Sequence, residues 1–138
     1  MVDYSKLSDF DINKRIAHVL GNAQVNQVYD EIGGSAVQYT IYKSSGLNRE
    51  GLMSATPCNV KKDFCNNPDD AWQIIVDSKI SLHHSICRWY ADSIVYDKKY
   101  KDGFFIFSSC SDIGDISSRG ALRAAMIVFL MMQDAKNG

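Results

Sequence analysis

Residues 88–90, Arg-Trp-Tyr, have the side chains of this chain that are best suited to binding chemistry. A guanidinium can hold a phosphate through paired hydrogen bonds, and aromatic rings can stack a nucleobase. If the segment is a strand, Arg88 and Tyr90 share one face and Trp89 takes the other. The alternative is an ordinary half-exposed strand without a ligand. The pattern makes Arg88 and Tyr90 candidate ligand-binding residues.

Two more arginines lie near the start of the last predicted helix. Arg119 stands before the apolar run of this helix, and Arg123 stands inside it. A helix N-terminus offers free N–H groups to an anion, and a nearby arginine adds positive charge. Arg123 needs a partner, which can be an internal carboxylate, a neighbouring subunit or a ligand phosphate. We favour a structural ion pair, and we add Arg119 and Arg123 to the candidate ligand-binding residues.

The side chains that usually serve catalysis and metal binding form no recognisable arrangement. The spacing of the four cysteines fits no CxxC or zinc-finger pattern. His83 and His84, on a predicted strand, point to opposite faces. We therefore expect no catalytic residues, no metal and no cofactor. The four cysteines, which we expect to be free thiols, are Cys58, Cys65, Cys87 and Cys110.

The composition is typical of one soluble domain. The chain has 138 residues, of which 46% are hydrophobic and 22% are charged, and this length allows a core without disulfides or metal. Its formal net charge of −1 argues against a surface that neutralises many phosphates, so we expect no nucleic-acid partner. The first ten residues have neither the basic start nor the apolar core of a secretory signal. We expect a cytoplasmic protein with reduced cysteines.

The first half of the chain predicts one helix and two strands. A serine cap, early aspartates and apolar residues at helical spacing predict a helix over Asp9–Leu20. Residues 24–30 and 36–43 alternate well enough for strands, with a hairpin signal at 33–35. Residues 44–63 show no sustained periodicity. We expect a long surface loop there, of the kind that is often functional or mobile.

The second half predicts a short helix followed by a hairpin. Asn-Pro at 67–68 opens the helix, on which we expect Trp72 to pack in the core. Residues 81–96 fit one bent strand or two strands with a tight corner. The β-forming residues of 104–109 then predict a hairpin with 87–95.

The last helix is apolar all round. Ser117 or Ser118 caps it and it runs to about Ala135, and Arg123 is the only polar residue within 121–132. Such a helix is either the centre of the core or shared with another copy, and it is too short to span a bilayer. The element order is α-β-β-α-β-β-α, which predicts an α+β fold with an antiparallel sheet of about four strands and three helices. We also expect a homodimer or larger assembly.

Three segments resemble the NinX-like proteins of temperate lambdoid phages. They are residues 4–15 (YSKLSDFDINKR), 65–75 (CNNPDDAWQII) and 122–133 (LRAAMIVFLMMQ). Gln73 stands where the family pattern has proline, and residues 119–121 replace an Asn-Pro start. The likeness does not extend to 22–63 or 81–116. It implies a single-domain accessory protein acting in the infected bacterial cytoplasm, and it implies no catalytic residues.

These observations lead to three hypotheses of function. The first is a non-enzymatic accessory protein, acting in counter-defence, that sequesters a small anionic host signal of the nucleotide type. Its pocket would use Arg88, Tyr90, Arg119 or Arg123, at a subunit interface if the chain is a homo-oligomer. The second is a protein inhibitor of a host enzyme or defence protein, binding through 44–63 or through an exposed aromatic strand. The third is an enzyme that acts on a nucleotide.

Overall fold

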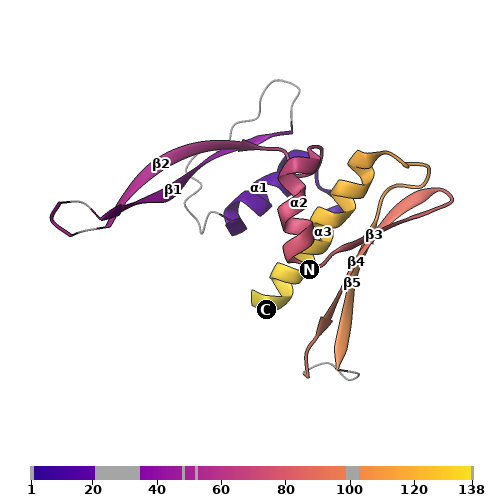
Figure 1. The fold of residues 1–138 in the computed structure, drawn as a ribbon. Coiled ribbons are helices and arrows are strands. Elements are labelled where there is room, and N and C mark those ends of the chain that lie inside the picture. Colours follow the sequence, from indigo (N-terminus) through magenta and orange to yellow (C-terminus); the bar gives the residue numbers. More distant parts are fainter. Residues whose placement is uncertain (1, 21–34, 48, 52, 99–102, 138) are drawn as a thin grey trace.

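The described part of the chain forms an α+β fold, as predicted (Figure 1). The computed structural model describes residues 2–20, 35–47, 49–51, 53–98 and 103–137. Its helices are α1 (Asp9–Leu20), α2 (Pro68–Asp77) and α3 (Ser118–Asn137), preceded by one 3-10 turn, η1 (Tyr4–Lys6). Its strands are β1 (Val37–Leu47), β2 (Met53–Lys62), β3 (Ser81–Ser85), β4 (Arg88–Tyr96) and β5 (Phe104–Cys110). The strands form two antiparallel sheets, β1-β2 and β3-β4-β5, and not one sheet as expected.

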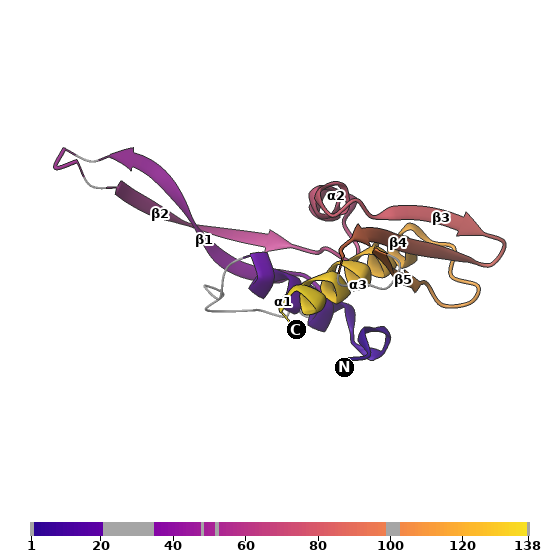
Figure 2. The same cartoon turned by 90° about the horizontal axis from the view of Figure 1, so that it is seen from below.

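α3 is the central helix of the core (Figures 1 and 2). It packs against the three-stranded sheet and against both α1 and α2. Its buried apolar side chains are Ala121, Leu122, Ala124, Ala125, Met126, Ile127, Val128, Phe129, Leu130 and Met132. The interpretation of 121–132 as the central core helix is therefore confirmed, and its burial requires no second copy. Among the described residues, no helix is long and apolar enough to cross a membrane.

Side-chain caps begin the three helices where the sequence predicts them. The Ser8 hydroxyl accepts a hydrogen bond of 3.1 Å from the amide three residues further on. Asn67 accepts one of 3.0 Å from the amide two residues on, and Pro68 takes the first helical position. Ser117 accepts one of 3.2 Å from the amide three residues on, so Ser117 and not Ser118 caps α3.

α2 turns Trp72 toward solvent, so the prediction that Trp72 packs in the core is wrong. Its side chain is 65% exposed, whereas Ala71, Ile74 and Ile75 are buried. With 3.6 residues per turn, the three buried residues form one face and Trp72 lies at the edge of that face. The sequence shows the apolar residues of this helix but not how narrow the covered face is.

The prediction of a surface loop over 44–63 is wrong, because most of this segment is strand. β1 and β2 form a long hairpin that extends away from the helices (Figures 1 and 2). The strand expected over 36–43 is confirmed, but its partner is β2; the strand predicted over 24–30 lies outside the described residues. Neither strand has a second neighbour among the described residues. Pro57 fits there, since proline is tolerated in edge strands.

The three-stranded sheet confirms the hairpin predicted in the second half. Residues 81–96 form two strands with a tight turn, and β4 pairs with β5 in the register that joins Ser93 to Phe107. Ala91, Ser93 and Phe107 are buried on the face that packs against α3. The opposite face of this sheet is the outer face, and it carries the first candidate residues.

Candidate functional site

The outer face of β3-β4-β5 displays every second residue of its strands. Arg88 and Tyr90 lie on this face, as predicted, because Ala91 and Ser93 are buried on the other one. Trp89 lies on the inner face, where its indole Nε1 donates to the carbonyl of Ile116 at 2.9 Å. Its backbone amide also donates to a serine hydroxyl at 2.9 Å. The sequence therefore placed Arg88 and Tyr90 correctly relative to Trp89.

One end of the outer face is polar. His83 stacks on Tyr90, with 5.3 Å between ring centroids and 10° between the ring planes. The Nδ1 atom of His83 lies 3.5 Å from a carboxylate oxygen of Asp92. Arg88 donates through Nη1 to the Cys110 sulfur at 3.2 Å, and its buried Nε atom has no partner among the described residues. This end can offer a cation and a flat aromatic surface to a ligand.

The other end of the outer face is apolar and exposed. We call it the sheet patch, and it consists of two cross-strand pairs, Ile94 with Ile106 and Tyr96 with Phe104. Their exposed fractions are 65%, 49%, 76% and 47%, in that order. The sequence analysis missed these four residues. The run of four apolar residues at 104–107 was the available signal, because period-2 alternation then places apolar side chains on both faces.

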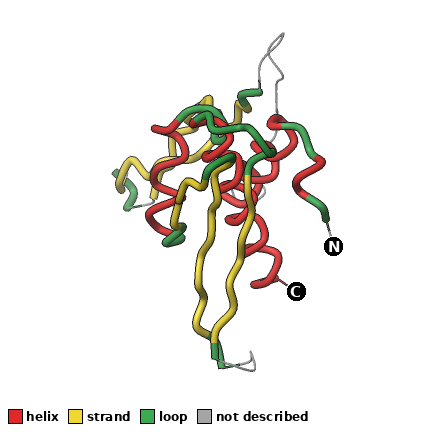
Figure 3. Tube along the Cα trace, turned by 90° about the vertical axis from the view of Figure 1, so that its right-hand side faces the viewer, coloured by secondary structure: helices red, strands yellow, loops and turns green. Residues whose placement is uncertain are grey.

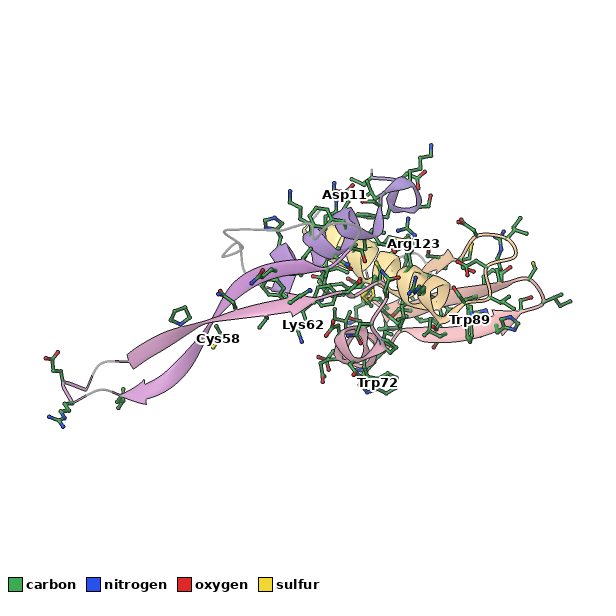
Figure 4. The ribbon with its side chains drawn as sticks, turned by 90° about the horizontal axis from the view of Figure 1, so that it is seen from above. Asp11, Cys58, Lys62, Trp72, Trp89 and Arg123 are labelled. Carbon is green, nitrogen blue, oxygen red and sulfur yellow. The ribbon has the colours of Figure 1, made fainter. Side chains whose placement is uncertain are left out.

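Arg123 is bound inside the protein by three acceptors. Its Nη1 atom lies 2.7 Å from the Asp9 carboxylate, and its Nη2 atom donates to the carbonyls of Ser5 at 3.1 Å and Leu7 at 2.6 Å. This is the structural ion pair that we favoured from the sequence. In Figure 4, Arg123 lies near the middle of the molecule, whereas Trp89 lies out on the three-stranded sheet.

In the described part of the chain, the four candidate ligand-binding residues do not line a common pocket. Arg88 and Tyr90 share the outer sheet face, and Arg119 is exposed in the first turn of α3. Arg123 and Cys110, the acceptor of Arg88, line a common cavity of only about 30 Å³. That volume is about the share of one water molecule in the liquid. A nucleotide therefore finds no enclosed site there.

A polar network beside Arg123 joins the three segments that resemble the phage family. The amide nitrogen of Asn13 donates to the Ser35 carbonyl at 2.9 Å and to Asp63 at 2.8 Å, and its amide oxygen accepts from Cys65 N at 3.1 Å. Asn66 donates to Asp63 and, at 3.2 Å, to the same Asp9 that pairs with Arg123. The network holds α1, the base of the β1-β2 hairpin, the start of α2 and α3 together.

The four cysteines lie in the described part of the chain and form no disulfide. Cys58 is half-buried, Cys87 and Cys110 are exposed, and all of them are free. Cys65 is buried, and burial raises the pKa of its thiol well above the ordinary range. Among the described residues, no group of three or more histidine, cysteine or acidic side chains could hold a metal ion.

A groove of about 550 Å³ lies between η1, β5 and the C-terminal half of α3. Phe105, Phe107, Ile127 and Met131 contribute much of its apolar lining. The Tyr4 hydroxyl donates to the Asp134 carboxylate at its edge. Desolvation, followed by this hydrogen bond to a carboxylate, raises the pKa of Tyr4 to about 12. No local sequence pattern indicates the groove, because its walls come from both ends of the chain.

The raised pKa of Tyr4 makes stability depend on alkaline pH. In the unfolded chain the Tyr4 hydroxyl loses its proton at about pH 10, whereas in the folded protein it keeps the proton up to about pH 12. Unfolding is therefore favoured as the pH rises from about 10 to 12. We expect Tyr4→Phe to be less stable than the wild type near pH 8 but to lose less stability between about pH 9 and 11.5. Urea unfolding of both proteins at each pH measures this; parallel pH curves would contradict it.

Together the fold and these surfaces define a small α+β domain with an apolar sheet face and an apolar groove. The family model described as bacteriophage P22, NinX matches residues 3–133, so the chain belongs to this family of phage accessory proteins. The resemblance of the three segments is thereby confirmed. Searches of curated proteins and of solved structures found no match.

Proposed function

We propose that this phage protein is a non-catalytic inhibitor that acts in counter-defence, in the cytoplasm of the infected bacterium, by binding a host protein. It binds through the outer face of β3-β4-β5. The observation that carries the proposal is the sheet patch, in which four large apolar side chains lie exposed in two adjacent pairs. Contiguous exposed apolar residues are typical of interaction surfaces.

The layout of the outer face fits a protein partner better than a small molecule. The centre of a protein interface is apolar and rich in aromatic side chains, and its rim is polar. Ile94, Tyr96, Phe104 and Ile106 supply such a centre, Asp92 supplies a polar group beside it, and Arg88 lies at the polar end of the same face. None of the four patch residues lines the groove or the small cavity described above.

The patch proposal predicts that two serine substitutions abolish partner binding. We expect Ile94→Ser with Ile106→Ser to reduce capture of a stoichiometric partner from infected bacteria at least about tenfold, because a central apolar contact contributes about 1–2 kcal/mol or more. Ile113→Ser is the matched control, since Ile113 is 79% exposed but lies in the loop before α3. Quantitative mass spectrometry of affinity-purified wild type, double variant and control measures the effect.

Equal capture by all three proteins would refute the patch as the binding surface. A second copy of this chain is a competing occupant, since we expected a homo-oligomer from the sequence. Light scattering of the purified protein distinguishes the two. A dimer that the double variant breaks, with no other protein captured, would replace inhibition with self-association at this face.

A second candidate function is sequestration of a small anionic signal of the nucleotide type. The observation that favours it is the Arg88 Nε atom, which has no partner in the described part of the chain, on the same sheet face as the stacked pair His83 and Tyr90. Native mass spectrometry with a pool of cyclic and linear nucleotides tests it. A discrete added mass that Arg88→Ala removes would support this function; no added mass would leave the protein inhibitor as the better proposal.

A further inference from the structure

We propose that the free edge of β5 and the groove beside it bind an extended peptide segment of a partner protein, which adds a fourth strand to β3-β4-β5. This site uses the backbone edge of β5 and the groove, whereas the sheet patch uses outward side chains, and the inference does not rest on the proposed function above. Figure 3 shows the N-terminal segment and the C-terminal end of α3 on the same side of the β4-β5 hairpin. The groove lies between these parts.

The position of the groove identifies the open edge of the sheet. β5 supplies Phe105 and the residues 107–109 to its lining, whereas β3 and β4 supply none. Among the described strands, β5 pairs with β4 alone. The groove therefore runs along the side of β5 that has no strand neighbour, with η1 as its opposite wall and α3 as its floor.

The backbone of β5 offers unpaired hydrogen-bonding groups to this groove. Ser111 N donates to the Trp89 carbonyl at 2.9 Å, which turns the odd-numbered residues of β5 toward β4. The N–H and C=O groups of Phe104, Ile106 and Ser108 then point to the free edge. No hydrogen bond to these groups is found within the described chain. They form the spaced donor and acceptor row that an added strand requires.

β5 also lacks the features by which proteins protect an edge strand. Lysine, proline, bulges and inward charges usually prevent unwanted pairing. Residues 104–110, Phe-Phe-Ile-Phe-Ser-Ser-Cys, contain no charged residue and no proline, and their register with β4 has no bulge. An unprotected edge strand of this kind can pair with other chains and aggregate unless a partner covers it.

The residues that line the groove indicate which peptide side chains it would bind. Ile127 and Met131 on the floor favour apolar side chains at alternate positions of the peptide, because a strand turns every second side chain to the same face. The charged residues of the lining are Asp3 and Asp134, and no lysine or arginine is among them. Asp134 uses one oxygen for Tyr4. A lysine or arginine in the peptide complements these carboxylates.

The test uses the full chain and ten-residue peptides selected against it from a random library. We expect the selected peptides to alternate apolar residues and to carry a lysine or arginine. Binding should slow hydrogen exchange at the amides of Phe104, Ile106 and Ser108 at least about tenfold. Selected peptides that leave these amides unprotected, or a library that gives no binder, would overturn the proposal.

Two substitutions at one position test the backbone contact directly. Ser108→Pro removes an edge N–H that makes no bond to β4, and proline is tolerated on an edge strand. Ser108→Ala is the matched control, because it removes the hydroxyl and keeps the N–H. We expect the proline variant to bind the peptide at least about tenfold more weakly, since hydrogen bonds along the added strand supply the affinity. Equal affinities of both variants would refute strand addition.

A charge substitution and the patch variant complete the test. Asp134→Asn keeps an oxygen acceptor for Tyr4 and removes the charge, so we expect weaker binding that high salt makes equal to the wild type. Ile94→Ser, which changes the sheet patch on β4 and leaves β5 intact, should not alter peptide affinity and so separates this site from the sheet patch. Protection of the β5 edge that appears without peptide and rises with protein concentration would overturn the proposal in favour of a second copy.

Discussion

Replacing Asn13 with leucine should lower the free energy of unfolding by about 3 kcal/mol. Asn13 is fully buried, and its side chain makes three hydrogen bonds to Ser35, Asp63 and Cys65. Leucine has nearly the same size but leaves a backbone amide, a carbonyl and a carboxylate without these partners. Each unsatisfied buried group costs about 1–3 kcal/mol, and the apolar side chain offsets only part of that. Urea unfolding followed by circular dichroism measures the loss.

The matched control for Asn13 is Lys14→Ala on the next position of α1. Lys14 is exposed, and alanine favours the helix, so we expect a change within about 0.5 kcal/mol. Asn13→Asp should also destabilise strongly, because it places a second carboxylate against Asp63 and removes the donor. A leucine variant as stable as the control would show that the network does not hold α1 to the hairpin base.

The segments that resemble the family are also the segments that this network joins. Asp9 and Asn13 come from the first segment, Asn66 from the second and Arg123 from the third. These polar side chains satisfy one another's hydrogen bonds, since each has a partner within the described chain. The sequence could show the segments but not that they converge, because their contacts are made across more than fifty positions.

The helices were predictable because their signals are local. Ser8, Asn67 and Ser117 cap the helices that follow them, and Pro68 fits the first turn only. The β4-β5 hairpin was predictable for a similar reason, since strong β-formers flank its turn. Such signals depend on neighbours within a few residues, and tertiary contacts did not override them.

The β1-β2 hairpin was not predictable, because much of it lies away from the core. Val37 and Tyr39 are buried at its base, and this part was recognised as a strand. Farther along, Leu47 and Pro57 are exposed. A strand without a covered face has no alternation of apolar and polar residues to reveal it. The absence of a period over 44–63 therefore did not exclude strands there.

The candidate site was predictable only where it depends on strand alternation. Arg88 and Tyr90 share a face because period 2 requires it. Whether Arg119 and Arg123 join them depends on how α3 packs against the sheet, which no local pattern states. α3 covers the inner face of the sheet, and Arg123 points toward α1. Arg123 therefore lies away from Arg88 and Tyr90, which are on the outer face.

Replacing Arg123 with alanine should destabilise the fold by about 2–3 kcal/mol and leave the binding surfaces intact in the folded fraction. Its guanidinium holds Asp9 and the carbonyls of Ser5 and Leu7, which join η1 and α1 to α3. Its side chain is 26% exposed, so water can reach part of the site, and the loss stays below that of a fully buried ion pair. Urea unfolding of Arg123→Ala gives the value.

The variant Arg123→Lys distinguishes a structural role of Arg123 from a role in binding an anion. Lysine keeps the charge, yet a single ammonium cannot reach three acceptors in the geometry of a guanidinium. We expect lysine to recover less than half of the stability, whereas a loosely held phosphate would accept lysine nearly as well as arginine. If Arg123→Lys and Arg123→Ala were both as stable as the wild type, and Arg123→Ala no longer bound a nucleotide found by native mass spectrometry, Arg123 would be a ligand-binding residue and not a structural one. The three short contacts of its guanidinium argue for the scaffold.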